Sequence, residues 1–149
     1  MFCLRETLSH HCNKIADLDG FHLLEMLMVV VVISILATIG MPLYTQHLAQ
    51  AKRVEAKSIL LQVASAMEEY AVHNHTYAGA TLAALHHSEM TAQQHYRLQI
   101  QTANDEGFLL AALPQGKQAT DDQACATLTL DDKGTKGITG TGLVNKCWQ

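Results

Sequence analysis

The sequence MLMVVVVISILATI, residues 26–39, is an almost unbroken apolar run. No Lys, Arg, Asp or Glu occurs between Met26 and Ala51. With its flanks the apolar stretch is about 24 residues, or roughly 36 Å of helix, and the hydrocarbon core of a bilayer is about 30 Å thick. The segment can therefore cross a membrane. A buried core helix is the alternative, but a chain of 149 residues has few other elements with which to surround it.

A secretory signal peptide is the second alternative for this run. Such peptides have an apolar region of about 7–15 residues followed by a small-residue cleavage site. This run is longer, and the sequence Pro42-Leu43-Tyr44 that follows it is a poor cleavage site. A membrane-spanning segment remains the better interpretation.

One continuous helix is predicted from Phe21 to about Val72. After residue 44 its apolar positions recur at spacings of 7, 4, 3, 4 and 3, which indicates an amphipathic helix: Ala49, Ala56, Leu60, Val63, Met67 and Tyr70. Pro42 removes one backbone hydrogen bond and should bend or locally melt the helix. A helix of about 75 Å is longer than a domain of this size can cover, so its first half must contact lipid or partner chains.

The remainder of the chain is predicted to be a polar, His-rich connector followed by a small sheet. The connector, residues 73–95, could hold a short helix near Leu82–His86. Alternating apolar and polar residues, or short apolar runs between turn signals, predict strands at 96–101, 108–113 and 124–130, and a weaker one around Ile138. Short turns between strands favour an antiparallel meander. The expected fold class is α+β, with the second half of the helix lying on one face of the sheet.

The chain contains four cysteines, of which Cys3 and Cys12 lie in a polar N-terminal stretch, residues 1–20, that is expected to be a leader outside the fold. If this leader is lost, only Cys125 and Cys147 remain. A disulfide between them would close a glycine-rich loop with few apolar residues and contribute about 3 kcal/mol. It would also indicate an oxidising compartment, whereas the alternative is two free thiols in a cytosolic protein.

The segment Gly20-Phe21-His22-Leu23-Leu24-Glu25 and the apolar run after it resemble the class III signal of type IV pilins and pseudopilins. The shared features are Gly followed by Phe, Glu at the fifth mature position, a long apolar run and Pro42 at the twenty-second. His22 departs from the Thr that is usual there. The sequence CATLTLDDKG, residues 125–134, and the ending Cys147-Trp148 look like those of minor pilins of the PilE type.

This resemblance implies that a prepilin peptidase cuts after Gly20 and methylates the new N-terminus at Phe21. It implies four regions: a leader (1–20), a transmembrane and filament-core segment (21–44), an amphipathic helix segment (45–72) and a globular region (73–149). The implied partners are other pilin subunits, the peptidase, the pilus assembly platform and the inner membrane. The implied location is the inner membrane, as a single-pass precursor with a periplasmic C-terminal domain, and later the cell surface.

Glu25 is a carboxylate within an apolar block, and such a group is usually functional or paired. In a packed filament its natural partner is the positive amine of Phe21 on a neighbouring subunit. That contact would set the axial register, as a buried polar pair does in a coiled coil. The alternative is a tolerated carboxylate at the membrane surface.

Other site types find little support in the sequence. The five histidines between residues 73 and 95 lack the spacing of a zinc site, and the pairs Asp121-Asp122 and Asp131-Asp132 lack a glycine-punctuated calcium loop. No nucleophile–base constellation occurs, so we expect neither an enzyme nor a cofactor. The net charge of −4 gives no direct nucleic-acid site.

The expected function is a structural pilin, more plausibly minor than major, in a filament for adhesion, twitching or DNA uptake. The sequence does not choose among these roles. One alternative is a pseudopilin of type II secretion, against which a C-terminal disulfide loop speaks. The other is a bitopic membrane-anchored binding module or enzyme, which would not be cleaved after Gly20.

Overall fold

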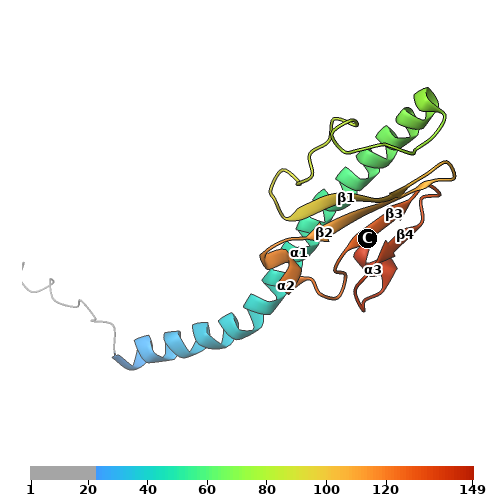
Figure 1. Cartoon of the computed structure of the whole chain (residues 1–149). Coiled ribbons are helices and arrows are strands. Elements are labelled where there is room, and N and C mark those ends of the chain that lie inside the picture. The colour runs from blue at the N-terminus through green and yellow to red at the C-terminus, as the bar shows by residue number, and fades with distance from the viewer. Residues whose placement is uncertain (1–22) are drawn as a thin grey trace, which may run out of the picture. The chain divides into compact units, whose positions relative to one another are not determined.

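The computed structural model describes residues 23–149, except for the side chains of residues 41–43. In chain order its elements are α1 (Leu23–Asn74), β1 (Tyr96–Ala103), β2 (Phe108–Pro114), α2 (Lys117–Asp121), β3 (Leu128–Asp131), β4 (Lys136–Ile138) and α3 (Val144–Cys147) (Figure 1). The chain divides after Gly40 into two compact units, Met1–Gly40 and Met41–Gln149. The predicted leader, with Gly20, Phe21 and the first two cysteines, lies outside the described residues.

Helix α1 confirms that one long helix precedes the sheet. The helical pattern continues without a break through Pro42, so the helix does not end there, and the bend expected at this proline stays a prediction. In the second unit the helix presents one stripe to the sheet. The side chains of Ala56, Leu60, Val63 and Met67 are almost completely buried, and Tyr70 is half-buried. The face predicted from the apolar spacing is therefore the face that packs in the core.

The sheet is a four-stranded antiparallel meander with the strands in sequence order, β1-β2-β3-β4. Strand β2 is interior and apolar, and its residues Leu110, Ala111 and Ala112 are all buried. Strands β1 and β3 alternate instead, because successive side chains of a strand point to opposite faces. The buried positions on β1 and β3 are Tyr96, Leu98, Leu128 and Leu130. Together with the buried side chains of β2 and α1 they form one hydrophobic core. Figure 1 shows the second half of α1 running along this sheet.

Some predicted boundaries were wrong. Strand β1 continues to Ala103, beyond the predicted end at residue 101. A bulge between Ile100 and Thr102 shifts the register, and Ala103 then pairs with Phe108 of β2. Strand β3 begins only at Leu128, because Ala126 has a φ of 50° and its N–H bonds the carbonyl of Asp122 in a turn.

The connector holds no helix at residues 82–86. Hydrogen bonds from His86 to Ala83 and from His87 to Leu82 close a single turn there, and a φ of 57° at His86 ends it. The short helices α2 and α3 were not predicted. Each has only a few residues, which is too short for a periodic apolar pattern to emerge.

Candidate functional site

The described part of the first unit, residues 23–40, is a helix with an exposed apolar surface. Every large apolar side chain from Leu23 to Ile39 is at least 46% exposed. The most apolar 18-residue window of α1 has a mean hydropathy of 2.5, and none of it is buried by the rest of the chain. A surface of this extent needs lipid or other protein chains to cover it, and by length and composition α1 can cross a membrane.

Two hydroxyl groups interrupt this apolar surface without leaving a free donor. Ser34 Oγ donates to the carbonyl of Val30 at 2.7 Å, and Thr38 Oγ1 donates to the carbonyl of Ile35 at 2.7 Å. Both hydrogen bonds stay within one turn of the helix. The hydroxyls therefore need no outside partner in hydrocarbon, where an unsatisfied polar group costs several kcal/mol.

Glu25 is the acidic residue of the first turn of α1, and its side chain is exposed. A carboxylate is favourable near a helix N-terminus because of the helix dipole. Phe21, the residue expected to supply its partner amine, lies outside the described residues, as does Gly20. The register role of Glu25 and the cleavage at Gly20 therefore stay predictions.

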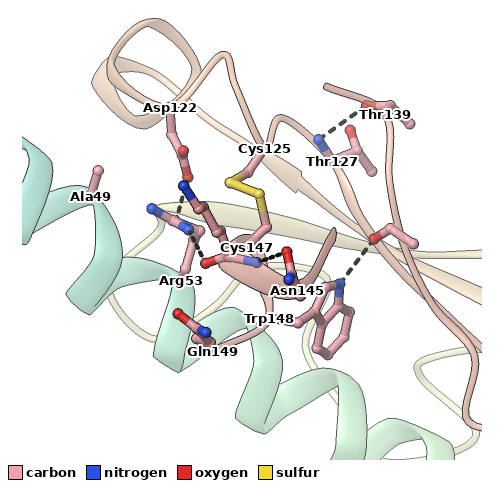
Figure 2. The surroundings of a disulfide bond; sticks show 12 residues. Ala49, Arg53, Asp122, Cys125, Thr127, Thr139, Asn145, Cys147, Trp148 and Gln149 are labelled. Carbon is pink, nitrogen blue, oxygen red and sulfur yellow. Dashed lines mark hydrogen bonds and ion pairs between the residues drawn. A yellow bond between two sulfur atoms is a disulfide. The ribbon is translucent and has the colours of Figure 1, made fainter. Parts of the chain in front are cut away.

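The buried stripe of α1 in the second unit contains one charged residue, Arg53, which is 9% exposed. Its Nε lies 2.9 Å from Asp122 Oδ2 at the end of α2, and its Nη1 donates to the carbonyl of Lys146 at 3.4 Å. The Nε–H does not point squarely at the carboxylate, so the first contact is an ion pair rather than an aligned hydrogen bond. Figure 2 shows Arg53 reaching from α1 toward the disulfide region.

A polar cluster surrounds this ion pair. Gln118 Nε2 lies within hydrogen-bond distance of the carbonyl of Ala49 (3.2 Å), Tyr96 Oη (2.9 Å) and Asp122 Oδ2 (3.1 Å). Burial raises the pKa of Asp122, an effect that the Arg53 guanidinium opposes. Burial also raises the pKa of Tyr96 to about 12, so its hydroxyl stays neutral. The cluster joins α1, β1 and α2 through groups that would be costly to leave unpaired.

The disulfide Cys125–Cys147 confirms the pairing considered from the sequence, with an S–S distance of 2.04 Å and a Cα–Cα distance of 5.7 Å. Both cysteines are buried. Backbone bonds support the same region: Gly140 N–H donates to the carbonyl of Cys125 at 3.2 Å, and Gly142 N–H donates to that of Ala124 at 2.7 Å. A Cβ at Gly140 would lie 2.2 Å from the Ala124 carbonyl oxygen, so only glycine fits this approach.

Lysines of α1 and β4 contact Gln149 and Trp148 near this disulfide. Lys136 Nζ of β4 lies 5.5 Å from the centroid of the Trp148 ring, whose Nε1 donates to the carbonyl of Gly137 at 3.0 Å. Lys57 of α1 donates to the carbonyl of Gln149, and burial, together with the charges of Arg53 and Lys136, lowers its pKa.

Lys146 of α3 is exposed and lies two residues before Trp148 in the sequence. We call Lys57, Lys136, Lys146 and Trp148 the basic patch. Burial and then the neighbouring cations disfavour the charged form of Lys57, and an anion placed beside it would offset both effects on its pKa. Its members come from α1, β4, α3 and the segment after α3, and the net charge of the chain conceals them.

Two of the aspartates considered as possible calcium ligands make hydrogen bonds or ion pairs within the fold. Asp131 Oδ1 accepts hydrogen bonds from the backbone N–H groups of Thr135 (2.6 Å) and Lys133 (3.0 Å), which lower the pKa of Asp131 and hold the β3–β4 turn. Asp122 pairs with Arg53. Within residues 23–149, no three His, Cys, Asp or Glu side chains come close enough to hold a metal ion.

The architecture can be compared with solved structures. The chain is similar to the non-core minor pilin PilV of Neisseria meningitidis, with 24% identity and a TM-score of 0.52 over 65% of this chain and 92% of that one. It is also matched to a type IV pilin from Shewanella oneidensis, with 28% identity and a TM-score of 0.45 over 68% of this chain and 98% of that one. The first likeness identifies the α+β pilin fold.

The family is defined by a second comparison. Residues 42–129 match the model of a family described as "Type IV minor pilin ComP, DNA uptake sequence receptor". The chain belongs to this family. No curated protein sequence matches the chain. Membership and fold together make the protein a structural pilin with an apolar N-terminal helix suited to membrane anchoring.

Proposed function

We propose that this chain is a minor subunit of a type IV pilus, held first in the inner membrane by α1 and then moved into the filament. The observation that carries the proposal is the exposed apolar helix surface between Leu23 and Ile39, with one carboxylate, Glu25, in its first turn. Such a surface can be covered by lipid in the precursor and by the helices of other pilin subunits in the filament. The C-terminal domain would then face the periplasm before assembly and the outside afterwards.

Assembly on this proposal needs a free N-terminus. The prepilin peptidase would cut after Gly20, whose lack of a side chain leaves the scissile bond accessible, and would methylate the amine of Phe21. The pilus assembly platform would then bring the helix beside its neighbours. There the amine of Phe21 on one subunit would neutralise Glu25 on another, because neither charge is tolerated alone in an apolar bundle.

The processed protein is expected to begin at Phe21 and to carry one added methyl group. Mass spectrometry of protein recovered from cells measures both features. Replacing Gly20 by Val should block cleavage, since the larger side chain crowds the protease site. The control His22→Thr introduces the residue usual in the family at that position and should be processed normally.

Recovery of an intact Met1, or of a cut at another position, would contradict the pilin proposal. That result would favour the bitopic membrane-anchored module, which keeps its N-terminus. A type II secretion pseudopilin would be processed in the same way, but the family match and the C-terminal disulfide favour the pilin.

A second function, DNA capture, is favoured by the family description together with the basic patch. We propose that Lys57, Lys136 and Lys146 contact phosphates while the half-buried Trp148 supplies an aromatic surface. Cationic side chains beside an aromatic ring are a common arrangement for binding nucleic acid. The proposal uses a local concentration of charge, which a chain with a net charge of −4 can still possess.

Replacing Lys136 by Ala is expected to weaken DNA binding and to lower the salt dependence of the affinity by about one unit of slope. Fluorescence anisotropy of a labelled DNA duplex with the detergent-solubilised full chain measures both quantities. Lys133→Ala is the matched control, because Lys133 is an exposed lysine of the β3–β4 turn outside the basic patch. Equal loss in both variants, or no loss in either, would reject the basic patch as the DNA-binding surface.

A further inference from the structure

The C-terminal loop closed by the disulfide packs in the core with α1, and one side chain of α1, Arg53, also makes polar contacts beside both of its ends. One guanidinium nitrogen contacts the Asp122 carboxylate at 2.9 Å, and another contacts the carbonyl of Lys146 at 3.4 Å. Asp122 precedes Cys125 by three residues, and Lys146 directly precedes Cys147. Arg53 therefore contacts the chain just before each half of the disulfide (Figure 2).

Each contact is transmitted to its cysteine through a hydrogen-bonded turn. The carbonyl of Asp122 accepts from the N–H of Cys125 at 3.2 Å, so the position of Asp122 fixes the start of that turn. On the other side, the N–H groups of Lys146 and Cys147 donate to the carbonyl of Leu143 at 3.0 and 3.1 Å. Fixing Asp122 and Lys146 therefore limits where the two sulfur atoms can be.

The loop between the cysteines is ordered by the pairing of β3 and β4 and by backbone hydrogen bonds, and it has few buried apolar side chains of its own. Of the loop residues, only Leu128 and Leu130 are buried large apolar side chains. Both belong to β3, in the first part of the loop. The segment after β4 is mostly exposed up to Cys147. Arg53 sits in a helix whose buried stripe packs in the hydrophobic core with side chains of β1, β2 and β3. It is also almost completely buried, so its charge is strongly disfavoured unless both partners are present.

We propose that Arg53 is a positioning residue for disulfide formation: it brings the Cys125 and Cys147 thiols together before they are oxidised. The oxidant is a small-molecule or protein disulfide. The thiolate of one cysteine attacks it, forming a mixed disulfide and releasing one thiol of the oxidant. The thiolate of the second cysteine then attacks the mixed disulfide, releasing the second thiol. Two protons and two electrons leave the protein, and the second step depends on how close the two cysteines already lie.

The quantity that tests this proposal is the effective concentration of the two thiols, measured at equilibrium in mixtures of reduced and oxidised glutathione. The full chain in detergent micelles is used, with Cys3 and Cys12 replaced by Ser so that one pair titrates. Replacing Arg53 by Met keeps a long side chain without the charge and is expected to lower the effective concentration about tenfold or more, since two charge-assisted contacts are lost. Arg53→Lys should give a smaller loss, because an ammonium group cannot span two partners as a guanidinium can.

Lys52→Met is the matched control, since Lys52 is the preceding cation of the same helix, lies off the buried stripe and is only half-buried. Its effective concentration should equal that of the parent chain. Thermodynamic linkage distinguishes a role in positioning the thiols from a role in the stability of the fold alone. Replacing a residue that stabilises the oxidised and reduced folds equally lowers the melting temperature of both and leaves the effective concentration unchanged.

An unchanged effective concentration in a folded Arg53→Met chain would overturn the proposal, whatever happens to its melting temperature. An equal fall in Lys52→Met would overturn it as well. If Arg53→Met does not fold, Arg53→Lys and Asp122→Asn decide the matter, because both keep the size of the side chains. The proposal requires both to lower the effective concentration, and it is rejected if either leaves it unchanged.

Discussion

The Glu25→Gln chain is expected to be cleaved normally after Gly20 and inserted in the membrane, yet to enter filaments at a small fraction of the wild-type level. The amide keeps the size of the side chain and removes its charge, so insertion of the apolar helix should be unaffected or slightly improved. In the filament the amine of Phe21 would be buried without a counter-charge. Removing one partner of a buried pair costs about 3–5 kcal/mol, a factor of several hundred or more at each subunit addition.

The measurement is the ratio of this subunit in sheared filaments to that in membranes, compared with the ratio for the wild-type chain. Glu69→Gln is the control, because Glu69 is an exposed carboxylate of the same helix within the C-terminal unit. At a filament tip fewer neighbours would bury the amine, so a tip-located minor subunit should show a smaller reduction. A normally processed Glu25→Gln chain that enters filaments at wild-type levels would contradict the register role of this carboxylate.

The Cys147→Ser chain is expected to lose the order of its C-terminal region while keeping the core. Removing a native disulfide from a small domain typically costs about 2–5 kcal/mol. The loss should be greatest after β3, because α1, β1 and β2 lie outside the loop and form most of the core, to which the loop adds Cys125, Cys147 and the buried leucines of β3. Helix α3, with four residues, has little apolar contact of its own beyond Cys147 itself.

Limited proteolysis with mapping of the cut sites measures this effect. New cuts should appear between residues 132 and 149 in the Cys147→Ser chain and in wild-type protein treated with reductant. The control Cys3→Ser alters a cysteine of the predicted leader and should leave the digestion pattern unchanged. If reduction of the wild-type protein opens no new sites, the disulfide is unimportant for the order of this region.

The features that the sequence predicted well are those with a repeated pattern. The apolar stripe of α1 extends over several helical turns, so its helical spacing is clear in the sequence. Each predicted position from Ala49 to Met67 is buried. Strands β1 and β2 alternate or run apolar between turn signals and were found near their true bounds. The disulfide was open to prediction because only two cysteines follow the leader.

The features that were missed depend on contacts between distant segments. Arg53 lies on the buried stripe between Ala49 and Ala56, whose spacing of seven is wider than the others, and this wide spacing was the one available signal of a buried charge. Its partner Asp122 lies far along the chain, and a pair of adjacent aspartates gives no sign of which one will be buried. The basic patch was missed for the same reason, because its lysines are far apart in the sequence. The chain also has more acidic than basic residues, so its net charge gives no sign of a local basic surface.

The hydroxyls of Ser34 and Thr38 bear on whether assembly can be undone. Both are already bonded to the carbonyls of their own helix, so no hydrogen bond has to be exchanged when acyl chains around the segment are replaced by neighbouring helices. Lipid tails and apolar side chains are nearly equivalent surroundings for such a surface. If the chain assembles as proposed, partitioning between bilayer and filament would be governed by close packing and by the charge of Glu25. A subunit held in this way would be able to return to the membrane intact when the filament is dismantled, with no covalent step in that transfer.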